Sequence, residues 1–193
     1  MAEIGGTFVH PYNDPFVIAG QGTVGLEIAD DCAAFGIAPD VVFVPCSGGG
    51  LTAGVTLAVT ERFSSAKVYA AEPAGFDDYA RSLKAGQPER NARLSGSICD
   101  ALLAPEPGAI GFQINKQRLA GAVAVGDAQA LSAVGLAFDE LRLVLEPSGA
   151  IGLAALLTGQ IEVAGRTIVV VLSGGNVDEA MLADGLRNYR KGS

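Results

Sequence analysis

The chain has 193 residues, of which 49% are hydrophobic, and a formal net charge of −8 at pH 7. This length predicts a single domain over residues 1–193 with one sizeable core. The acidic balance and the lack of a dense Lys/Arg cluster exclude a nucleic-acid partner, and no uncharged apolar stretch reaches the ~18 residues of a membrane span.

Short β-rich runs alternate along the chain with longer helical patterns. We predict strands at residues 7–10, 41–45, 67–71, 121–125 and 166–172. Helices are predicted at 15–35, with a weak point at 20–22, at 51–63, 77–84 and 127–140, and from 147 and 178 onward. Residues 86–107 are rich in Pro, Gly and Ser and are predicted to form an irregular surface excursion.

Near-continuous apolar strands separated by helices favour an α/β fold. We expect a three-layer, doubly wound, mostly parallel sheet with helices on both faces.

Three cysteines, Cys32, Cys46 and Cys99, are widely spaced and odd in number. This pattern argues against a disulfide framework and against a zinc site. The first residues have neither the basic nor the apolar region of a signal peptide. We therefore expect reduced cysteines in a cytoplasmic protein, with no membrane partner.

Two glycine-rich loops follow predicted strands: Ser47-Gly48-Gly49-Gly50 after residues 41–45, and Ser173-Gly174-Gly175-Asn176 after the last strand. In a strand–Gly–helix unit the backbone approaches a ligand closely, and the helix N-terminus favours an anion. Both loops would lie at the carboxyl edge of a parallel sheet, where ligands bind. The simpler alternative is a pair of tight turns that require positive φ.

A nicotinamide site is one interpretation of the first loop. Residues 48–53 fit G-x-G-x-x-A, and Glu72 ends the next strand, where an acid that binds ribose would stand. This interpretation leaves the second loop, 173–176, unexplained.

Several motifs, in order, resemble the threonine/serine dehydratases, which are fold-type II pyridoxal phosphate (PLP) enzymes related to serine racemase. The motifs are 10–15 (HPYNDP), 18–23 (IAGQGT), 44–51 (VPCSGGGL), 69–73 (YAAEP), 146–150 (EPSGA) and 172–178 (LSGGNVD). The resemblance covers essentially the whole chain but matches the later part of the enzyme. It implies the large domain of the tryptophan-synthase-β-like fold, truncated.

The resemblance implies a role for each matching residue. The backbone N–H groups of Ser47, Gly48, Gly49, Gly50 and Leu51 would hold the PLP phosphate. Ser173 would hydrogen-bond the pyridine nitrogen, a neutral contact that suits β-elimination of water. Ser47 departs from the family pattern, because many members have a fourth glycine there.

The racemase-like members of this family form a cation site, and its match here would be Glu72, the carbonyl of Phe76, and Asp78. Carboxylates and a backbone carbonyl are ligands that Mg²⁺ and Ca²⁺ use. Alternatively, the acidic residues mark a helix start, where Asp77 and Asp78 are favourable. We expect His10, the one histidine, to be structural, and Glu146 either to line the site or simply to precede a helix.

PLP chemistry needs a lysine that binds the cofactor as a Schiff base. The family carries it in a Ser-x-Lys-x-Arg-Gly-like segment, and none of the chain's lysines, Lys67, Lys84, Lys116 and Lys191, has such neighbours. We therefore expect no catalytic lysine here, non-covalent PLP, and a truncated chain, a gene fragment or half of a split enzyme.

The leading hypothesis is thus the phosphate-anchoring part of a threonine/serine dehydratase, inactive as this chain alone. Its substrate in the full enzyme would be a small amino acid. The chain would form a homo-oligomer or would complement a missing N-terminal segment. The alternatives are a non-catalytic anion-binding or partner module and an NAD-binding Rossmann-type domain.

Overall fold

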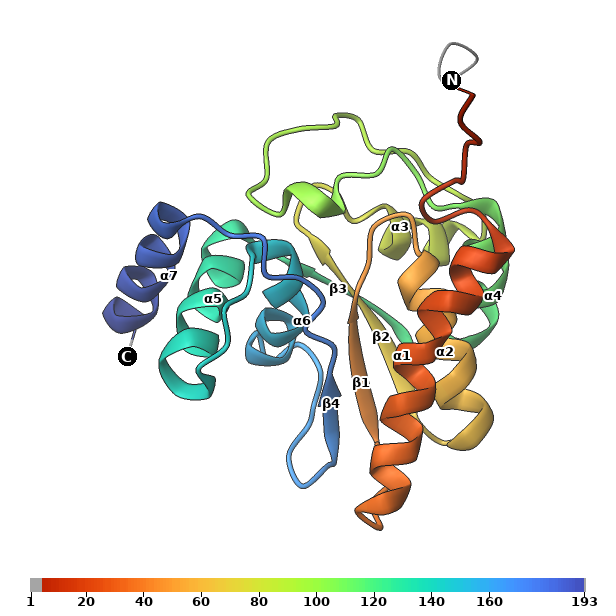
Figure 1. The fold of residues 1–193 in the computed structure, drawn as a ribbon, viewed down its shortest axis with the longest axis horizontal. Coiled ribbons are helices and arrows are strands. Elements are labelled where there is room, and N and C mark those ends of the chain that lie inside the picture. Colours follow the sequence, from red (N-terminus) through yellow and green to blue (C-terminus); the bar gives the residue numbers. More distant parts are fainter. Residues whose placement is uncertain (1–4, 193) are drawn as a thin grey trace.

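Four parallel strands form a single sheet with helices on both faces (Figure 1). The structure is a computed structural model and describes residues 5–192. The strand order is β3-β2-β1-β4, and the strands are β1 Val41–Pro45, β2 Lys67–Pro73, β3 Gly121–Val125 and β4 Ile168–Val170. The predicted α/β class with a parallel sheet is confirmed.

The helices alternate with the strands in the way that parallel pairing requires. They are α1 Pro15–Ala34, α2 Gly50–Arg62, α3 Asp78–Ala85, α4 Ala109–Arg118, α5 Asp127–Leu141, α6 Pro147–Leu157 and α7 Glu179–Gly192, with a short 3₁₀ helix, η2, at Asp100–Leu102.

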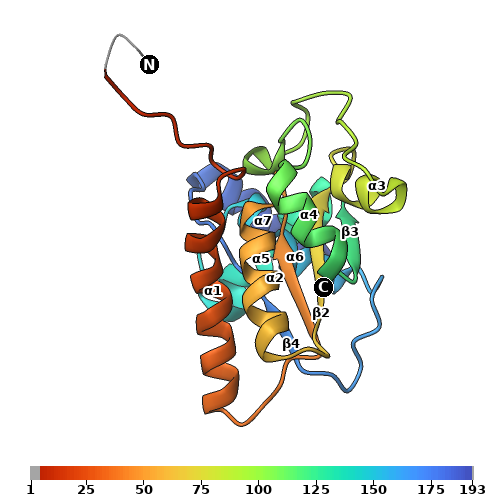
Figure 2. The same cartoon turned by 90° about the vertical axis from the view of Figure 1, so that its right-hand side faces the viewer.

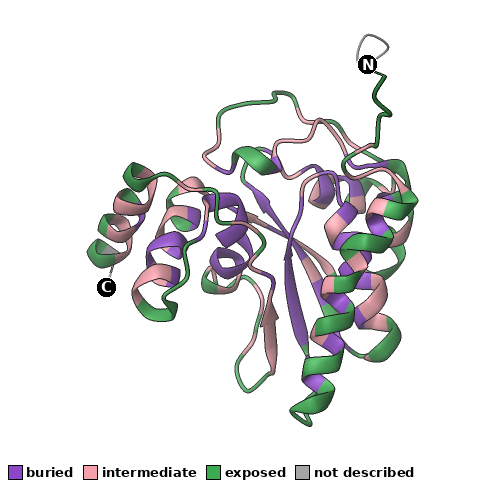
Figure 3. Cartoon of the chain, viewed as in Figure 1, coloured by how far each residue is buried: buried purple, intermediate pink, exposed green. Residues whose placement is uncertain are grey.

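The core lies on both faces of β1, one of the two inner strands (Figure 3). Val41 and Phe43 pack toward α5 and α6, whereas Val42 and Val44 pack toward α2. All four are completely buried. Because successive side chains of a strand point to opposite faces, a strand covered on both sides needs an unbroken apolar run.

The two helical layers differ in depth. On one face α2 contacts the sheet and α1 packs on α2 (Figure 2). On the other face α6 spans the strands, α5 packs on α6, and α7 packs on α5 (Figure 1). Residues 147–155 of α6 are all buried, in keeping with a sequence that is apolar apart from Ser148. Within residues 5–192, no helix is both long enough and apolar enough to cross a membrane.

The helix boundaries follow local signals. Asp14 Oδ1 accepts hydrogen bonds from the N–H groups of Phe16 (2.8 Å) and Val17 (3.1 Å), and Pro15 takes the first helical position of α1. The weak point at residues 20–22 does not interrupt α1. This helix packs along its length on α2, and that contact outweighs the low helix propensity of its glycines.

One assignment from the sequence is wrong, and one helix has no counterpart among the predicted elements. Residues 7–10 form no strand, because they lie outside the sheet with Phe8 and Val9 exposed and no neighbouring strand to pair with. Helix α4 was not predicted, because its polar sequence has little apolar periodicity. It is held by tertiary contacts: Phe112 and Asn115 are buried, and the Ile110 N–H donates to Asn13 Oδ1 at 3.0 Å.

Cys32, Cys46 and Cys99 are buried and free, as expected.

Candidate functional site

The first glycine loop joins the carboxyl end of β1 to the N-terminus of α2. Gly49 has φ +86°, and a Cβ there would overlap the hydroxyl of Tyr79. The Ala53 N–H donates to the Gly49 carbonyl at 2.9 Å and so closes the first turn of α2. The preceding N–H groups, those of residues 50–52, are the N-terminal donors of the helix, which favour an anion.

The ring of Tyr12 lies directly against this loop. A Cβ on Gly48 would overlap the Tyr12 ring, so the close approach requires glycine. The Gly48 carbonyl accepts a hydrogen bond from the Gly108 N–H at 2.9 Å, at the start of α4. The loop is therefore fixed from outside by two distant segments, and no local pattern in the sequence indicates that Tyr12 would reach it.

The second glycine loop lies beside the first, because β4 pairs with β1 in parallel register. Ser173 and residues 47–52 line one cavity of about 550 Å³. The structure thus brings together the six residues that we expect to bind the cofactor: Ser47, Gly48, Gly49, Gly50, Leu51 and Ser173.

The excursion 86–107 supplies a wall of the cavity through residues 100–104. Two serine hydroxyls hold this wall: Ser47 Oγ accepts the Ala104 N–H, and Ser148 Oγ accepts the Ala101 N–H, each at 3.1 Å. These wall residues were missed in the sequence, where the excursion has the pattern of an unattached surface loop.

Glu146 lies next to the second loop. Its Oε2 accepts the N–H of Asn176 at 2.9 Å, and both residues line a smaller cavity of about 380 Å³ with Asp100 and Ala101. Glu146 therefore does more than precede a helix, because it ties the second glycine loop to the start of α6.

His10 has a structural role in this arrangement. Its Nδ1 accepts the N–H groups of Asn13 at 3.0 Å and Tyr12 at 3.4 Å, and its ring meets the Tyr12 ring edge-on. Because Tyr12 rests on Gly48, this turn places an aromatic ring over the first loop.

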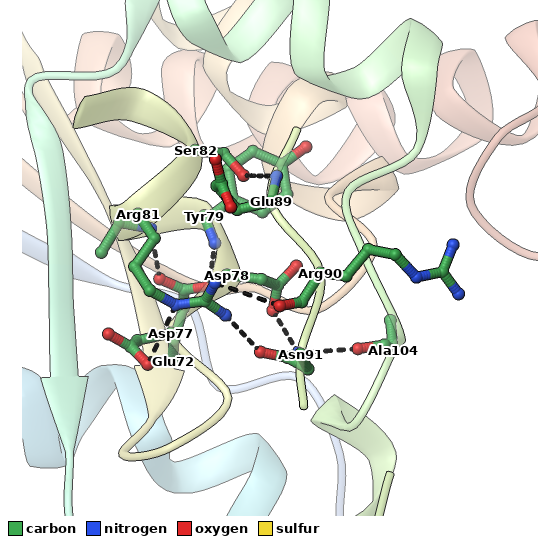
Figure 4. A network of polar contacts seen from close by, with 11 residues as sticks. Glu72, Asp77, Asp78, Tyr79, Arg81, Ser82, Glu89, Arg90, Asn91 and Ala104 are labelled. Carbon is green, nitrogen blue, oxygen red and sulfur yellow. Dashed lines mark hydrogen bonds and ion pairs between the residues drawn. The ribbon is translucent and has the colours of Figure 1, made fainter. Parts of the chain in front are cut away.

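Glu72 and Asp78 form a buried carboxylate pair beside this site (Figure 4). Glu72 Oε1 accepts the Tyr79 N–H at 2.7 Å, and Oε2 accepts the Ala80 N–H at 2.9 Å. Burial, as the main cause, and repulsion from Asp78, as the second, raise the pKa of Glu72 to about 8. Burial likewise raises the pKa of Asp78 to about 6.

The same contacts bear on the two ligand interpretations of Glu72. Because the Glu72 carboxylate is buried against the N-terminus of α3, it is not available to bind a ribose. The nicotinamide interpretation therefore loses the acidic residue that it requires. A cation is different, because each carboxylate oxygen has two lone pairs. Asp78 Oδ1 accepts from Asn91 at 2.7 Å, whereas Asp78 Oδ2 is buried without a partner in the part of the chain that is described.

Carboxylate and carbonyl oxygens are ligands of the type that a hard cation takes. Two buried carboxylates with raised pKa values would gain from a neighbouring positive charge, and the Phe76 carbonyl lies between them in the chain. No cluster of three or more His, Cys, Asp or Glu side chains that could hold a metal occurs within residues 5–192. A cation here would therefore need carbonyl or water oxygens as further ligands.

No lysine is among the described residues that line the main cavity. Lys67 begins β2, at the opposite edge of the sheet. Lys116 Nζ donates to the Gly86 carbonyl at 2.6 Å, and Lys84 and Lys191 lie in the last turns of α3 and α7. All four lysines thus lie away from the cavity lining, and the absence of a catalytic lysine stays a prediction.

The chain is similar in sequence to known proteins. The profile of the family described as "Pyridoxal-phosphate dependent enzyme" matches residues 1–174. The chain belongs to this family. It is 37% identical over 182 residues to the L-threonine ammonia-lyase of Thermotoga maritima, covering 93% of this chain and 43% of that protein. It is 35% identical over 195 residues to the serine racemase of Arabidopsis thaliana, covering 98% and 57%.

Solved structures agree on the fold. A threonine deaminase from T.th. superposes with a TM-score of 0.86 at 37% identity, covering 92% of this chain and 59% of that chain. Maize serine racemase gives a TM-score of 0.84 at 34% identity, covering 99% and 58%. The chain spans about half the length of the curated relatives it matches.

Proposed function

We propose that this chain is the PLP-phosphate-anchoring part of a threonine/serine dehydratase, which converts a small hydroxy amino acid to a 2-oxo acid and ammonia. The observation that carries the proposal is the shared cavity, in which the N-terminus of α2 and Ser173 face the same space. Family membership and the similarity to a threonine ammonia-lyase and a serine racemase support it.

PLP, when bound, supplies the electron sink for bond cleavage at the α-carbon of an amino acid. The residues of this chain would hold and orient it. The N–H groups of residues 47–51 would bind the phosphate, where the helix dipole favours negative charge. The Ser173 hydroxyl would hydrogen-bond the pyridine nitrogen, and the wall 100–104 would exclude water from one side of the cavity.

The cofactor-binding lysine would come from outside these 193 residues. No lysine lines the cavity in the described chain. We infer that the lysine lies on a segment, in the same or another polypeptide, that packs over the cavity mouth. Exposed apolar side chains such as Phe16 (86% exposed) and Phe35 (77%) on and just after α1 offer surface for such a segment or for a second copy.

Titration calorimetry tests the anchoring function. PLP and inorganic phosphate should bind the isolated chain, and NAD should not compete with either. Gly49→Val should abolish binding of both anions, because the side chain would overlap Tyr79 and force an unfavourable φ. Tighter binding of NAD than of PLP would overturn the proposal.

A non-catalytic anion-binding module is the second candidate. The position of the four lysines, all outside the cavity lining, favours it for the isolated chain. It is distinguished from the dehydratase part by complementation. Adding a lysine-bearing N-terminal segment of a relative should restore ammonia release from threonine only if the first proposal holds.

We also propose that Glu72, the Phe76 carbonyl and Asp78 hold Mg²⁺ or Ca²⁺. The unpartnered Asp78 Oδ2 beside a second buried carboxylate supports this proposal. Millimolar Ca²⁺ or Mg²⁺ should raise the melting temperature of the chain, whereas Asp78→Asn should remove the shift. An equal shift in wild type and variant would contradict a site at these residues.

A further inference from the structure

The backbone of Ala104, in the cavity wall, is hydrogen-bonded on both sides of the residue. Its N–H donates to Ser47 Oγ at 3.1 Å, and its carbonyl accepts from Asn91 Nδ2 at 2.9 Å. Asn91 is itself fixed, because it donates to Asp78 Oδ1 at 2.7 Å and accepts from Arg81 Nη2 at 2.6 Å (Figure 4). On the Asn91 side Ala104 is therefore anchored to the helix α3, whereas its N–H group depends on the Ser47 hydroxyl.

That hydroxyl belongs to Ser47, in the first glycine loop. A serine oxygen has one proton to donate and two lone pairs to accept with. In Ser47 one lone pair is used by the Ala104 N–H, and the hydroxyl proton has no acceptor among residues 5–192. Ser47 lines the same cavity as the N-terminus of α2, so its proton is available to an anion bound there.

Ser148 provides the natural comparison. Its hydroxyl holds the same wall three residues earlier, by accepting the Ala101 N–H at 3.1 Å. Ser148 lies at the start of α6 and does not line the main cavity. The two serines thus make equivalent bonds to the wall, but only Ser47 also faces the proposed phosphate position.

We propose that Ser47 is a positioning residue that couples phosphate binding to the order of the wall, residues 100–104. The inference rests on the proposed phosphate-anchoring function. An oxygen that donates its proton to an anion becomes a better acceptor, so phosphate binding strengthens the bond to Ala104. By linkage, loss of the bond to Ala104 weakens phosphate binding by the same factor. Glycine, which the resemblance leads us to expect at this position, cannot form this link.

Amide hydrogen exchange with and without PLP or inorganic phosphate tests the coupling on the full 193-residue chain. In wild type, either anion should slow exchange of the Ala104 amide about tenfold. In Ser47→Ala and Ser47→Gly the Ala104 amide should exchange faster in the free chain. Both anions should bind about tenfold more weakly, which is the effect of losing one charge-assisted hydrogen bond, and should no longer slow that exchange.

Ser148→Ala is the matched control. It should speed exchange at Ala101 in the free chain but keep the anion-dependent protection at Ala104. Two outcomes overturn the coupling: full anion-dependent protection of Ala104 in both Ser47 variants, or its loss in Ser148→Ala as well. If neither anion binds wild type, the anchoring function fails and the coupling fails with it. Binding to wild type with unchanged protection in the Ser47 variants overturns the coupling alone. Ser47→Gly keeps the loop backbone of the family pattern, so it remains informative if Ser47→Ala misfolds.

Discussion

The carboxylate of Glu72, at the end of β2, caps the helix α3 by accepting the backbone N–H of Tyr79 at 2.7 Å. Its other oxygen accepts the Ala80 N–H, so one side chain satisfies two of the N-terminal donors of the helix. Asp77, the residue at the N-cap position, makes no such bond, and its carboxylate faces Arg81 at 3.6 Å instead. A strand residue thus takes the capping role expected of the helix start, which leaves a buried carboxyl group beside Asp78.

Because Glu72 is buried, the free energy of unfolding should fall as pH rises. Its pKa is raised in the folded chain to about 8 from an ordinary value near 4.5, so the folded state holds a proton that the unfolded state releases. The resulting stability is fully present at acid pH and is lost as pH approaches 8. Between pH 6 and 8 in the presence of chelator, urea unfolding should show a loss of about 2 kcal/mol. Glu72→Gln should have a stability that is nearly independent of pH over this range, because Gln cannot titrate; an equal slope in the variant would contradict the assignment.

Gly49→Ala should destabilise the chain and weaken anion binding together. The added methyl group would meet the Tyr79 hydroxyl and occupy a left-handed φ, at a cost of roughly 2–3 kcal/mol. Gly36→Ala is the control, because Gly36 also has positive φ (+67°) but has open space around it. It should cost about 1 kcal/mol and leave phosphate affinity unchanged. Urea unfolding and calorimetry measure the two effects.

Ser173→Ala should separate ring binding from phosphate binding. If the hydroxyl contacts the pyridine nitrogen, PLP affinity should fall by roughly fivefold while inorganic phosphate binds as before. Ser173 is exposed at the cavity edge, so the substitution should leave the unfolding midpoint unchanged. Equal weakening of both ligands would place Ser173 at the phosphate instead.

His10→Ala should loosen the turn that carries Tyr12. The substitution removes the acceptor for the N–H groups of Asn13 and Tyr12, which costs about 1 kcal/mol. His10→Asn offers an oxygen in place of Nδ1 and should recover most of this stability. Thermal unfolding compares the variants, and a full loss of stability in His10→Asn would show that the ring itself is required.

The isolated chain should not turn over threonine. Removal of the α-proton needs a positioned base, and no lysine lines the cavity in the described residues. With PLP added, ammonia release should equal that of free PLP, and borohydride should fix no cofactor to Lys67, Lys84, Lys116 or Lys191. Sustained turnover that is lost on substitution of one of these lysines would show that the residue reaches the site.

The sequence by itself determined the elements whose signals are local. The apolar run at residues 41–44 specifies a strand buried on both faces, Asp14-Pro15 specifies the start of α1, and Ser47–Gly50 specifies a tight strand–turn–helix connection. The parallel sheet then follows, because strands that alternate with helices must return in the same direction. The proximity of Ser173 to Ser47 could be predicted for the same reason.

Only the tertiary structure decided how the site is enclosed. The bond between Ser47 and Ala104 spans 57 residues, and that between Ser148 and Ala101 spans 47. Helix α4 exists because Phe112 is buried against Tyr79 rather than because its sequence favours a helix. Residues 7–10 have β-branched and aromatic character but find no strand to pair with. Local propensity is a weak preference of a few tenths of a kcal/mol per residue, and burial and long-range hydrogen bonds outweigh it wherever distant segments meet.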